Sequence, residues 1–359
     1  MRITELGTSQ RDAWARCPAL HYHQYMMGTR GWGITPYAEP LALLFGQTGH
    51  VGLETWYTSI RAGVDPLAAV AASVTAMREK VTAIQKQWAE RGDGESAPTL
   101  IDGDEGDLII AEAFMAGYAN YFKDDAKFRI VAVEWSFNID AASFYEPALG
   151  LVKPPLPLSE MPPTRGTIDL VIETDKGFVL VDHKFHKSIV TDLETGSSFW
   201  PQAITYSRAV ELTFGPVAGF VYNQIRKPSG LKPKTIGGEL ESQDAFLERL
   251  RAEYILYPDY FERYNGGRKR GYFLRSPVLP VSTAPKRFLA ECLYRDGLMC
   301  ATYALLPDRV DFNAPPPTIP RNHAECSRWG RACPYVNLCT WGYNPATLRE
   351  FAEREEAHK

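Results

Sequence analysis

Two aspartates and a lysine interrupt the apolar alternation of residues 168–186, IDLVIETDKGFVLVDHKFH. The segment reads as a β-hairpin with its turn at Thr174–Gly177. That turn places Asp169 directly opposite Asp182, and strand periodicity places Lys184 on the same face. Facing residues have Cβ atoms about 4.5–5.5 Å apart, where two like charges are destabilising. We therefore expect a cation between the two carboxylates.

The opposite face of the same hairpin is apolar. The turn pairs Leu170 with Val181 and Ile172 with Val179, and we expect this face to pack on the core. Two other interpretations stay open from the hairpin alone. The polar face can be a solvated surface with an ordinary Asp–Lys pair. A turn with a glycine bulge would instead shift the register by one residue and separate the two aspartates.

Two carboxylates beside a lysine suit the chemistry of phosphodiesters. A hard divalent ion such as Mg²⁺ takes oxygen ligands and is commonly held by one or two carboxylates, water and substrate phosphate. Such an ion lowers the pKa of a bound water, and a neighbouring lysine can orient that water or stabilise the transition state. The hairpin therefore predicts a metal-dependent hydrolytic site.

Periodic segments surround the hairpin and must position these side chains. Strand-like alternation marks residues 128–140 before it and 217–225 after it. Between the hairpin and the second strand, a helix is expected from about Pro201 to a stop at Gly215. This order indicates a mixed α/β core with helical additions. Further helices are expected near residues 43–56, 66–91, 108–122, 242–263 and 283–305.

Four motifs follow one another along the chain. They are Gly46-Gln-Thr-Gly-His50, Gly166-Thr-Ile-Asp169, Asp182-His-Lys184 and Gln202-Ala-Ile-Thr-Tyr206. In this order they resemble the motifs of the PD-(D/E)XK nuclease superfamily, in its RecB-like branch. The resemblance implies a restriction-endonuclease-like fold, in which a mixed sheet core is flanked by helices.

The resemblance also implies roles for single residues. Asp169, Asp182 and Lys184 would be catalytic, and the metal, Mg²⁺ or Mn²⁺, would be held by His50, the two aspartates and the His183 carbonyl. Glu134 resembles an acid that the family often has in the preceding strand. A structural histidine remains the alternative for His50.

Gln202 and Tyr206 are four residues apart and hence on one helix face. The resemblance implies that they contact DNA or support the catalytic site. Routine helix polarity is the alternative interpretation for both residues.

Cysteines gather at the two ends of the chain. Cys326, Cys333 and Cys339 form a three-thiol group, and Cys17 is the natural fourth ligand; spacing alone leaves zinc and an iron-sulfur cluster open. Resemblance to an iron-sulfur subset of the branch, which includes CRISPR-associated members, implies a [4Fe-4S] cluster of mainly structural role. The interval between Cys326 and Cys333 is wider than in many relatives. Cys292 and Cys300 are expected to be buried as small apolar residues.

Net charge is −4, so a nucleic-acid surface would have to be a local patch. Two basic stretches, 225–234 and 263–275, combine cations for phosphate with aromatic rings for base stacking. A solvated basic loop is the alternative for each. The candidate DNA-binding residues are Arg226, Lys227, Arg268, Lys269, Arg270 and Tyr272.

The composition, 45% hydrophobic and 23% charged, is that of a globular protein. We expect one elaborated domain over residues 1–359: a mainly helical part to residue 125, a catalytic α/β core over 126–226, and a basic loop, helices and cysteines over 227–359. The metal cluster would join the helical additions at the two ends. Neither a leader-like start nor a membrane-length apolar run is seen, so a cytoplasmic location without membrane association is expected.

The resulting hypothesis is a metal-dependent DNA nuclease. We expect an exonuclease that processes single-stranded or duplex DNA ends in recombination, repair or phage- or CRISPR-type DNA metabolism. The sequence contains no GxxxxGK[ST] loop, so a helicase or recombinase motor would be a partner in trans. The alternatives are a non-catalytic DNA-binding or scaffold protein of a recombination complex, and a nuclease that acts on RNA.

Overall fold

The structure is a computed structural model, and its chain divides into two compact units. The first unit comprises Met1–Ala38, Ser136–Gly166 and Ser282–Lys359, and the second comprises Glu39–Trp135 and Thr167–Val281. The residues that the structure describes are 3–27, 33–36, 41–90, 106–186, 189, 200–226, 233–256, 258, 271–280, 285–306, 319–326, 332–341, 343–349 and 351–353.

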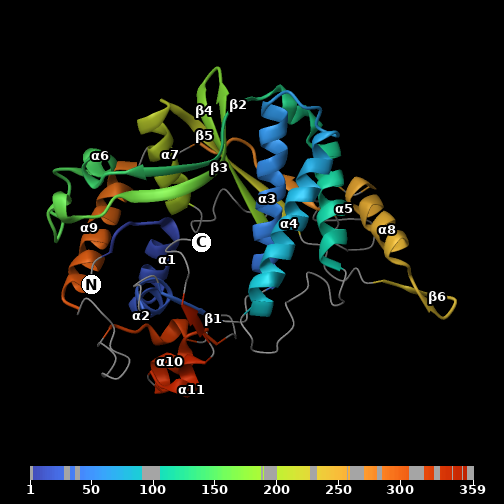
Figure 1. Cartoon of the computed structure of the whole chain (residues 1–359). Helices are drawn as coiled ribbons and strands as arrows, with labels where there is room; N and C mark the ends of the chain where they lie inside the picture. The colour runs from blue at the N-terminus through green and yellow to red at the C-terminus, as the bar shows by residue number, and fades with distance from the viewer. Residues whose placement is uncertain are drawn as a thin grey trace. The chain divides into compact units, whose positions relative to one another are not determined.

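A mixed sheet carries the polar hairpin. Its order is β2-β3-β4-β5-β8 in the described part of the chain (Figure 1). These strands are β2 (Arg129–Ile139), β3 (Thr164–Thr174), β4 (Gly177–His186), β5 (Val217–Arg226) and β8 (Phe273–Arg275). The strands expected near 128–140, 168–186 and 217–225 are therefore confirmed. The short strand β8 was not predicted.

The hairpin has the register that the sequence predicts. β3 and β4 are antiparallel, with Leu170 opposite Val181 and Ile172 opposite Val179. The turn closes at Gly177, whose φ is +116°, and a Cβ there would collide with the Pro216 carbonyl oxygen. Only glycine adopts this conformation without strain.

β4 and β5 are parallel, and His183 lies opposite Asn223 in their register. Parallel neighbours need a crossover, which is supplied by α7 (Trp200–Thr213). Pro201 lies in the first turn of this helix, and Gly215 follows its end with a φ of +128°, as expected. Both faces of β5 are largely buried, which is typical of a parallel strand.

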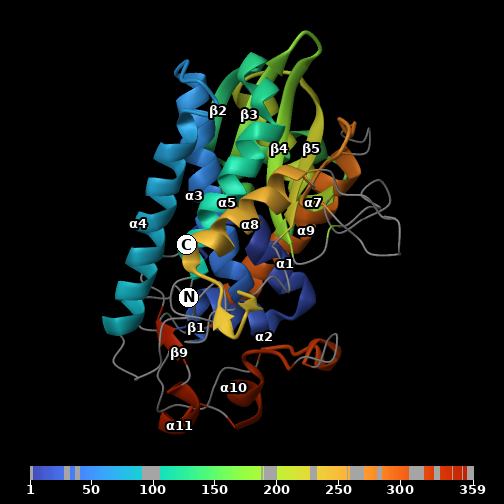
Figure 2. The same ribbon diagram turned by 90° about the vertical axis from the view of Figure 1, so that its right-hand side faces the viewer.

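Long helices cover the apolar face of the hairpin. They are α3 (Leu41–Arg61), α4 (Ala69–Glu90), α5 (Gly106–Tyr121) and α8 (Gln243–Leu256), which lie side by side in Figure 2. Leu170, Ile172, Val179 and Val181 join one core cluster with residues of these helices, including Trp56 and Tyr118. The predicted mixed sheet flanked by helices is therefore confirmed. Because α3 packs on the hairpin, a side chain of this helix can reach the strands.

The first unit has its own core. α1 (Thr8–Arg16), α2 (Pro18–His21) and the π-helical turn Tyr22–Met26 contribute to a buried cluster with α9 (Pro285–Ala304) and α10 (Val336–Trp341). Arg11 is buried here and its Nε lies 2.8 Å from Asp296 Oδ2. Cys292 and Cys300 are buried on α9, as expected.

Short elements complete the described chain. They are β1 (Ile34–Pro36) paired with β9 (Phe351–Glu353), β6 (Thr235–Ile236) paired with β7 (Glu239–Leu240), α6 (Ala141–Tyr145), α11 (Pro345–Leu348), and the 3₁₀ turns Lys123–Lys127, Glu146–Ala148, Leu158–Glu160 and His323–Glu325. In the segments that the structure describes, no helix combines the length and apolarity that a membrane crossing needs.

Candidate active site

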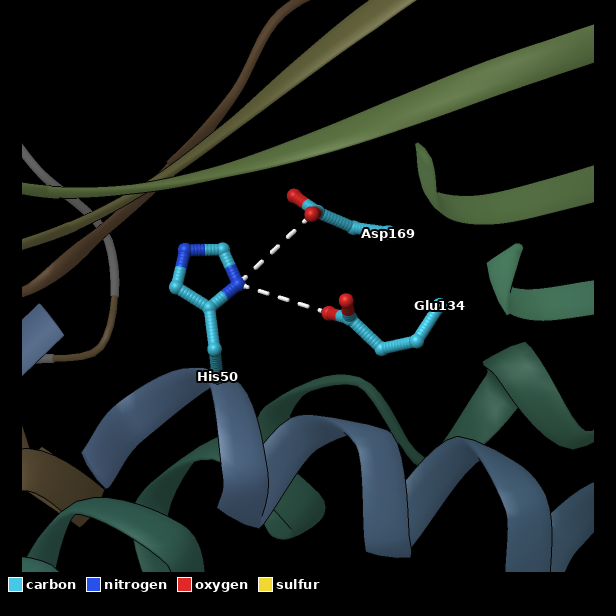
Figure 3. Close-up of side chains that lie close together, drawn as sticks. All are labelled: His50, Glu134 and Asp169. Carbon is cyan, nitrogen blue, oxygen red and sulfur yellow. Dashed lines mark ion pairs between the residues drawn. The ribbon is translucent and has the colours of Figure 1, made fainter. Parts of the chain in front are cut away.

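Three side chains from three elements of the second unit converge on one point. His50 Nδ1 on α3 lies 3.6 Å from Glu134 Oε1 on β2 and 3.6 Å from Asp169 Oδ1 on β3 (Figure 3). One ligand atom of each residue lies within 4.8 Å of the other two, a spacing that fits a single bound cation. Of the predicted metal ligands, His50 and Asp169 belong to this group and the Asp182 carboxylate does not. Its third member is Glu134, the acid that the sequence offered by resemblance.

Glu134 reaches this point from a strained backbone. Its φ is +44°, and among the residues described it is the one non-glycine with a positive φ. Such a conformation costs on the order of 1–3 kcal/mol and is held by the surrounding structure, most often at functional sites. The sequence offered Glu134 only through its family resemblance, because a single acid in a strand gives no sign of its backbone conformation.

Gly49 brings α3 close enough for His50 to reach the carboxylates. A Cβ at this position would overlap the ring of Phe185 on β4. The His50 and Phe185 rings are 5.2 Å apart between centroids. Phe185 directly follows Lys184, so the same contact fixes the distance between α3 and the end of the β3–β4 hairpin.

Asp169 is held by the backbone of the neighbouring strand. Its Oδ2 accepts a hydrogen bond from the His183 N–H at 2.6 Å. Burial raises the pKa of Asp169 to about 7, with further contributions from the Asp182 and Glu134 carboxylates and an opposing one from His50. This crowding of carboxylates is the electrostatic condition that a metal ion relieves.

His50 balances part of that charge. Burial lowers its pKa, but the Asp169 and Glu134 carboxylates outweigh burial, and the net shift of the His50 pKa is upward. A neutral imidazole nitrogen is a metal ligand, whereas a protonated imidazole is a counter-ion. His50 can therefore act as a metal ligand when it is neutral and as a counter-ion to the carboxylates when it is protonated.

Asp182 lies beside Lys184 and Gln202 rather than within the converging group. Lys184 Nζ is 2.7 Å from Asp182 Oδ2, and Gln202 Nε2 donates to Asp182 Oδ1 at 3.1 Å. Tyr206 is buried on α7 and hydrogen bonds to Gln202. The structure thus brings all four predicted residues together, and gives Asp182 a cationic partner from the chain itself.

Lys184 keeps its proton in this setting. Burial lowers its pKa, but the Asp182 and Asp169 carboxylates act more strongly together, so the Lys184 pKa is raised. An ammonium group at this place can neutralise charge that develops on a phosphate or orient a water, but is unsuited to accept a proton.

His183 is connected to a group of residues that sequence reasoning missed. Its Nδ1 lies 2.9 Å from the Asn223 amide nitrogen, and its ring is stacked on Tyr57. Burial keeps the pKa of His183 well below its ordinary value, so the imidazole is neutral. Tyr57 lies in an apolar helix pattern and Asn223 in an apolar strand, and neither pattern indicates a polar contact.

The four cysteines are gathered in the first unit. The Cys333 N–H donates to the Cys326 carbonyl at 2.8 Å, and the Asn322 N–H donates to Cys17 Sγ at 3.4 Å. Burial raises the pKa of Cys339 to about 11, and the thiols of Cys17, Cys333 and Cys326 add to the shift. His23 Nε2 lies 3.4 Å from Cys339 Sγ.

The candidate DNA-binding residues are described only in part. Lys227, Arg268, Lys269 and Arg270 lie outside the described residues. Tyr272 is 4% exposed, and the Arg226 guanidinium stands 5.0 Å from the centre of its ring. A ring buried in this way has no open face for a base, so Tyr272 is interpreted as a core residue.

This site joins carboxylate and imidazole groups to a protonated lysine on the strands of a mixed sheet flanked by helices, an arrangement that suits a metal-dependent phosphodiesterase. The family model of the PD-(D/E)XK nuclease superfamily matches residues 6–262 of the chain. The protein belongs to this superfamily of metal-dependent nucleases, and its fold is restriction-endonuclease-like. No curated protein matches the sequence.

The close approach of Gly49 to Phe185 predicts that any residue larger than glycine at position 49 disturbs the packing of α3 on the hairpin. In Gly49→Ala the added methyl group overlaps the Phe185 ring, and overpacking should lower the free energy of unfolding by about 1–3 kcal/mol. It should also weaken Mn²⁺ binding, because His50 moves with the helix. Urea unfolding and calorimetric Mn²⁺ titration measure the two effects.

Gly46→Ala is the matched control, because a Cβ there has only an ordinary contact with Phe185. It should stabilise the helix by about 0.5–1 kcal/mol. Equal behaviour of the two variants would contradict this account of Gly49.

The raised pKa of Asp169 predicts opposite effects of pH on stability and on metal binding. The folded, metal-free protein holds this proton up to about pH 7, whereas the unfolded chain releases it near pH 4. Raising the pH from about 4 to 7 should therefore lower the free energy of unfolding. Over the upper part of this range Mn²⁺ affinity should rise, because the ligand must be deprotonated.

Chemical denaturation and Mn²⁺ titration at matched pH values test this prediction. Asp169→Asn removes the titrating group and should flatten the stability profile. A wild-type profile that is already flat would show that Asp169 is ionised throughout.

Proposed function

We propose that the protein is a Mg²⁺- or Mn²⁺-dependent DNA nuclease of the RecB-like branch that acts on DNA ends. The observation that carries the proposal is the convergence of His50, Glu134 and Asp169 beside the Asp182–Lys184 pair. The order of the motifs along the chain supports the branch. Action on ends, by an exonuclease, rests on resemblance to relatives in recombination, repair or spacer acquisition.

His50, Glu134 and Asp169 would hold the metal ion. Their ligand atoms, one imidazole nitrogen and two carboxylate oxygens, lie within 4.8 Å of one another and fit one ion. Asp182 and the His183 carbonyl would supply further oxygen ligands from the adjacent strand. The bound ion would lower the pKa of a water and neutralise charge on the scissile phosphate.

Lys184 would orient the attacking water and stabilise the charge that develops on the phosphate. Asp182 positions the ammonium group at 2.7 Å, and Gln202 in turn holds Asp182. Tyr206 supports Gln202 from one helical turn further along α7. Hydrolysis by this route would leave a 5′-phosphate and a 3′-hydroxyl.

Phosphate contacts would come from basic side chains near the sheet. Arg226 lies at the end of β5, within the basic stretch 225–234. Its neighbour Lys227 and residues Arg268, Lys269 and Arg270 remain candidates from the sequence. Such contacts bind the nucleic-acid backbone without reading bases. A helicase or recombinase partner would supply any motor activity, and the nuclease would act in the cytoplasm.

A [4Fe-4S] cluster held by Cys17, Cys326, Cys333 and Cys339 is the second part of the proposal. The support for this cluster is the resemblance to the iron-sulfur subset of the branch, in which one cysteine before the nuclease core and three after it hold the cluster. Such a cluster would join the first and last parts of the first unit.

Lys184→Ala tests the catalytic assignment. Purified protein with Mg²⁺ or Mn²⁺ should degrade linear DNA, and the variant should be slower by about 10²–10³-fold, the usual effect of losing one group that stabilises transition-state charge. Lys176→Ala, in the exposed turn of the same hairpin, should cleave like wild type. Linear, circular, single-stranded and duplex DNA and RNA are compared.

Each pattern of cleavage has a distinct meaning. Cleavage restricted to linear substrates supports an exonuclease, and cleavage of RNA alone would replace the proposed substrate. If no nucleic acid is cleaved but DNA is bound, the protein is a scaffold, and equal rates for Lys184→Ala and wild type would reject the role of the lysine.

The cluster has a separate test. Protein purified without oxygen should be brown and contain about four iron and four sulfide per chain. Cys333→Ala should lose iron, whereas Cys292→Ala, which removes a buried thiol of the same unit, should retain it. Colourless protein with one zinc per chain would contradict the cluster assignment.

A further inference from the structure

A connected group of polar side chains, buried except for the partly buried Arg275, adjoins the strand that carries the proposed metal site. It consists of His183, Asn223, Tyr118, Tyr57, Asp125 and Arg275, all in the second unit. None of the four motifs in the sequence includes Asn223, Tyr118, Tyr57, Asp125 or Arg275. We refer to these six residues as the Asn223 network.

The network begins at the strand that carries the catalytic residues. His183 stands between Asp182 and Lys184, and its backbone N–H holds Asp169. Its ring lies 5.4 Å from the Tyr57 ring, with 15° between the planes. His183 is only 2% exposed to solvent. The side chain of His183 therefore fixes a peptide segment that touches three proposed site residues.

Asn223 joins this imidazole to the core. Its amide nitrogen lies 2.9 Å from His183 Nδ1 and 2.6 Å from the Tyr118 hydroxyl, so both of its protons are used. The parallel register places it opposite His183 on β5. Because Nδ1 accepts this hydrogen bond from the Asn223 amide, the imidazole carries its own hydrogen on Nε2 and is neutral.

The far side of the network is anchored by an ion pair. The Tyr118 and Tyr57 hydroxyls are 2.8 Å apart, and Tyr57 donates to Asp125 Oδ2 at 2.7 Å. Arg275 donates to both Asp125 oxygens at 2.8 Å, and it lies opposite Asn223 in the antiparallel pair of β5 and β8. Both Asp125 oxygens therefore accept hydrogen bonds, and this determines the direction in which the Tyr57 hydroxyl donates.

Such a network is an inefficient way to stabilise a core. Buried ion pairs are often replaceable by apolar residues without loss of stability, while a polar network fixes one geometry. We propose that Asn223, Tyr118, Tyr57, Asp125 and Arg275 are positioning residues, which hold the His183 peptide and through it Asp169 in the geometry required for metal binding. The inference rests on the proposed metal site.

Tyr118→Phe and Asn223→Leu test this inference, with Tyr254→Phe as the matched control. Tyr118 and Tyr254 are both fully buried in the same core cluster and both contact the rings of Phe114 and Phe273. The Tyr254 hydroxyl is buried without a hydrogen-bond partner in the described structure, whereas the Tyr118 hydroxyl bonds to Asn223. The two tyrosine variants therefore differ only in the network.

The readout is calorimetric Mn²⁺ binding to the full chain without DNA, at a temperature where circular dichroism shows each variant folded. Tyr118→Phe and Asn223→Leu should raise the Kd for Mn²⁺ by about 10-fold, the usual lower effect of losing a residue that orients a metal ligand. Tyr254→Phe should leave it unchanged. If Asn223→Leu does not fold, Tyr118→Phe decides the result.

The failures are distinguishable. A wild-type Kd retained in Tyr118→Phe, or an equal change in Tyr254→Phe, overturns the positioning role while the metal site stands. Wild type that binds no Mn²⁺ rejects the proposed metal site, and the positioning role with it.

Discussion

The repulsion between partly buried carboxylates is the constraint on which the rest of the second unit depends. Asp169 and Glu134 face the same nitrogen of His50 at 3.6 Å, and burial pushes the pKa of Asp169 upward. A chain that only had to fold would place apolar residues at such positions. Retaining acids here is reasonable where a cation completes the site, which is the chemistry of the superfamily to which the protein belongs.

Backbone geometry, rather than side-chain choice alone, builds this arrangement. Gly49 removes the atoms that would separate α3 from Phe185, and Glu134 accepts a left-handed conformation that ordinary residues avoid. Lys184 and Asp182 neutralise each other beside the converging group. The converging carboxylates with His50 and the Asp182–Lys184 ion pair are thereby kept as two adjacent groups, each with a cationic or protonatable partner for its acids.

The sequence predicts local geometry well and distant partners poorly. The register of the hairpin follows from its own alternation and turn, so the pairing of Leu170 with Val181 is confirmed. Strand periodicity predicts that Asp182 lies on the same face as Asp169, where the two were expected to share a cation. It does not predict the contact of Asp182 with Gln202, because that contact depends on where α7 packs. The neighbourhood of Arg275 and Asn223 could not be predicted from the sequence. The two residues are brought together by the register between β5 and β8, and no sequence pattern indicates that register.

The discontinuous make-up of the first unit has a consequence for the order of synthesis. Residues up to Ala38 are made before any of the second unit, yet their core partners on α9 and α10 are made after all of it. Every residue assigned to the metal site and its supporting network precedes Val281. On a ribosome that adds about 5–20 residues per second, the residues of the proposed metal site can come together before the early helices meet their core partners.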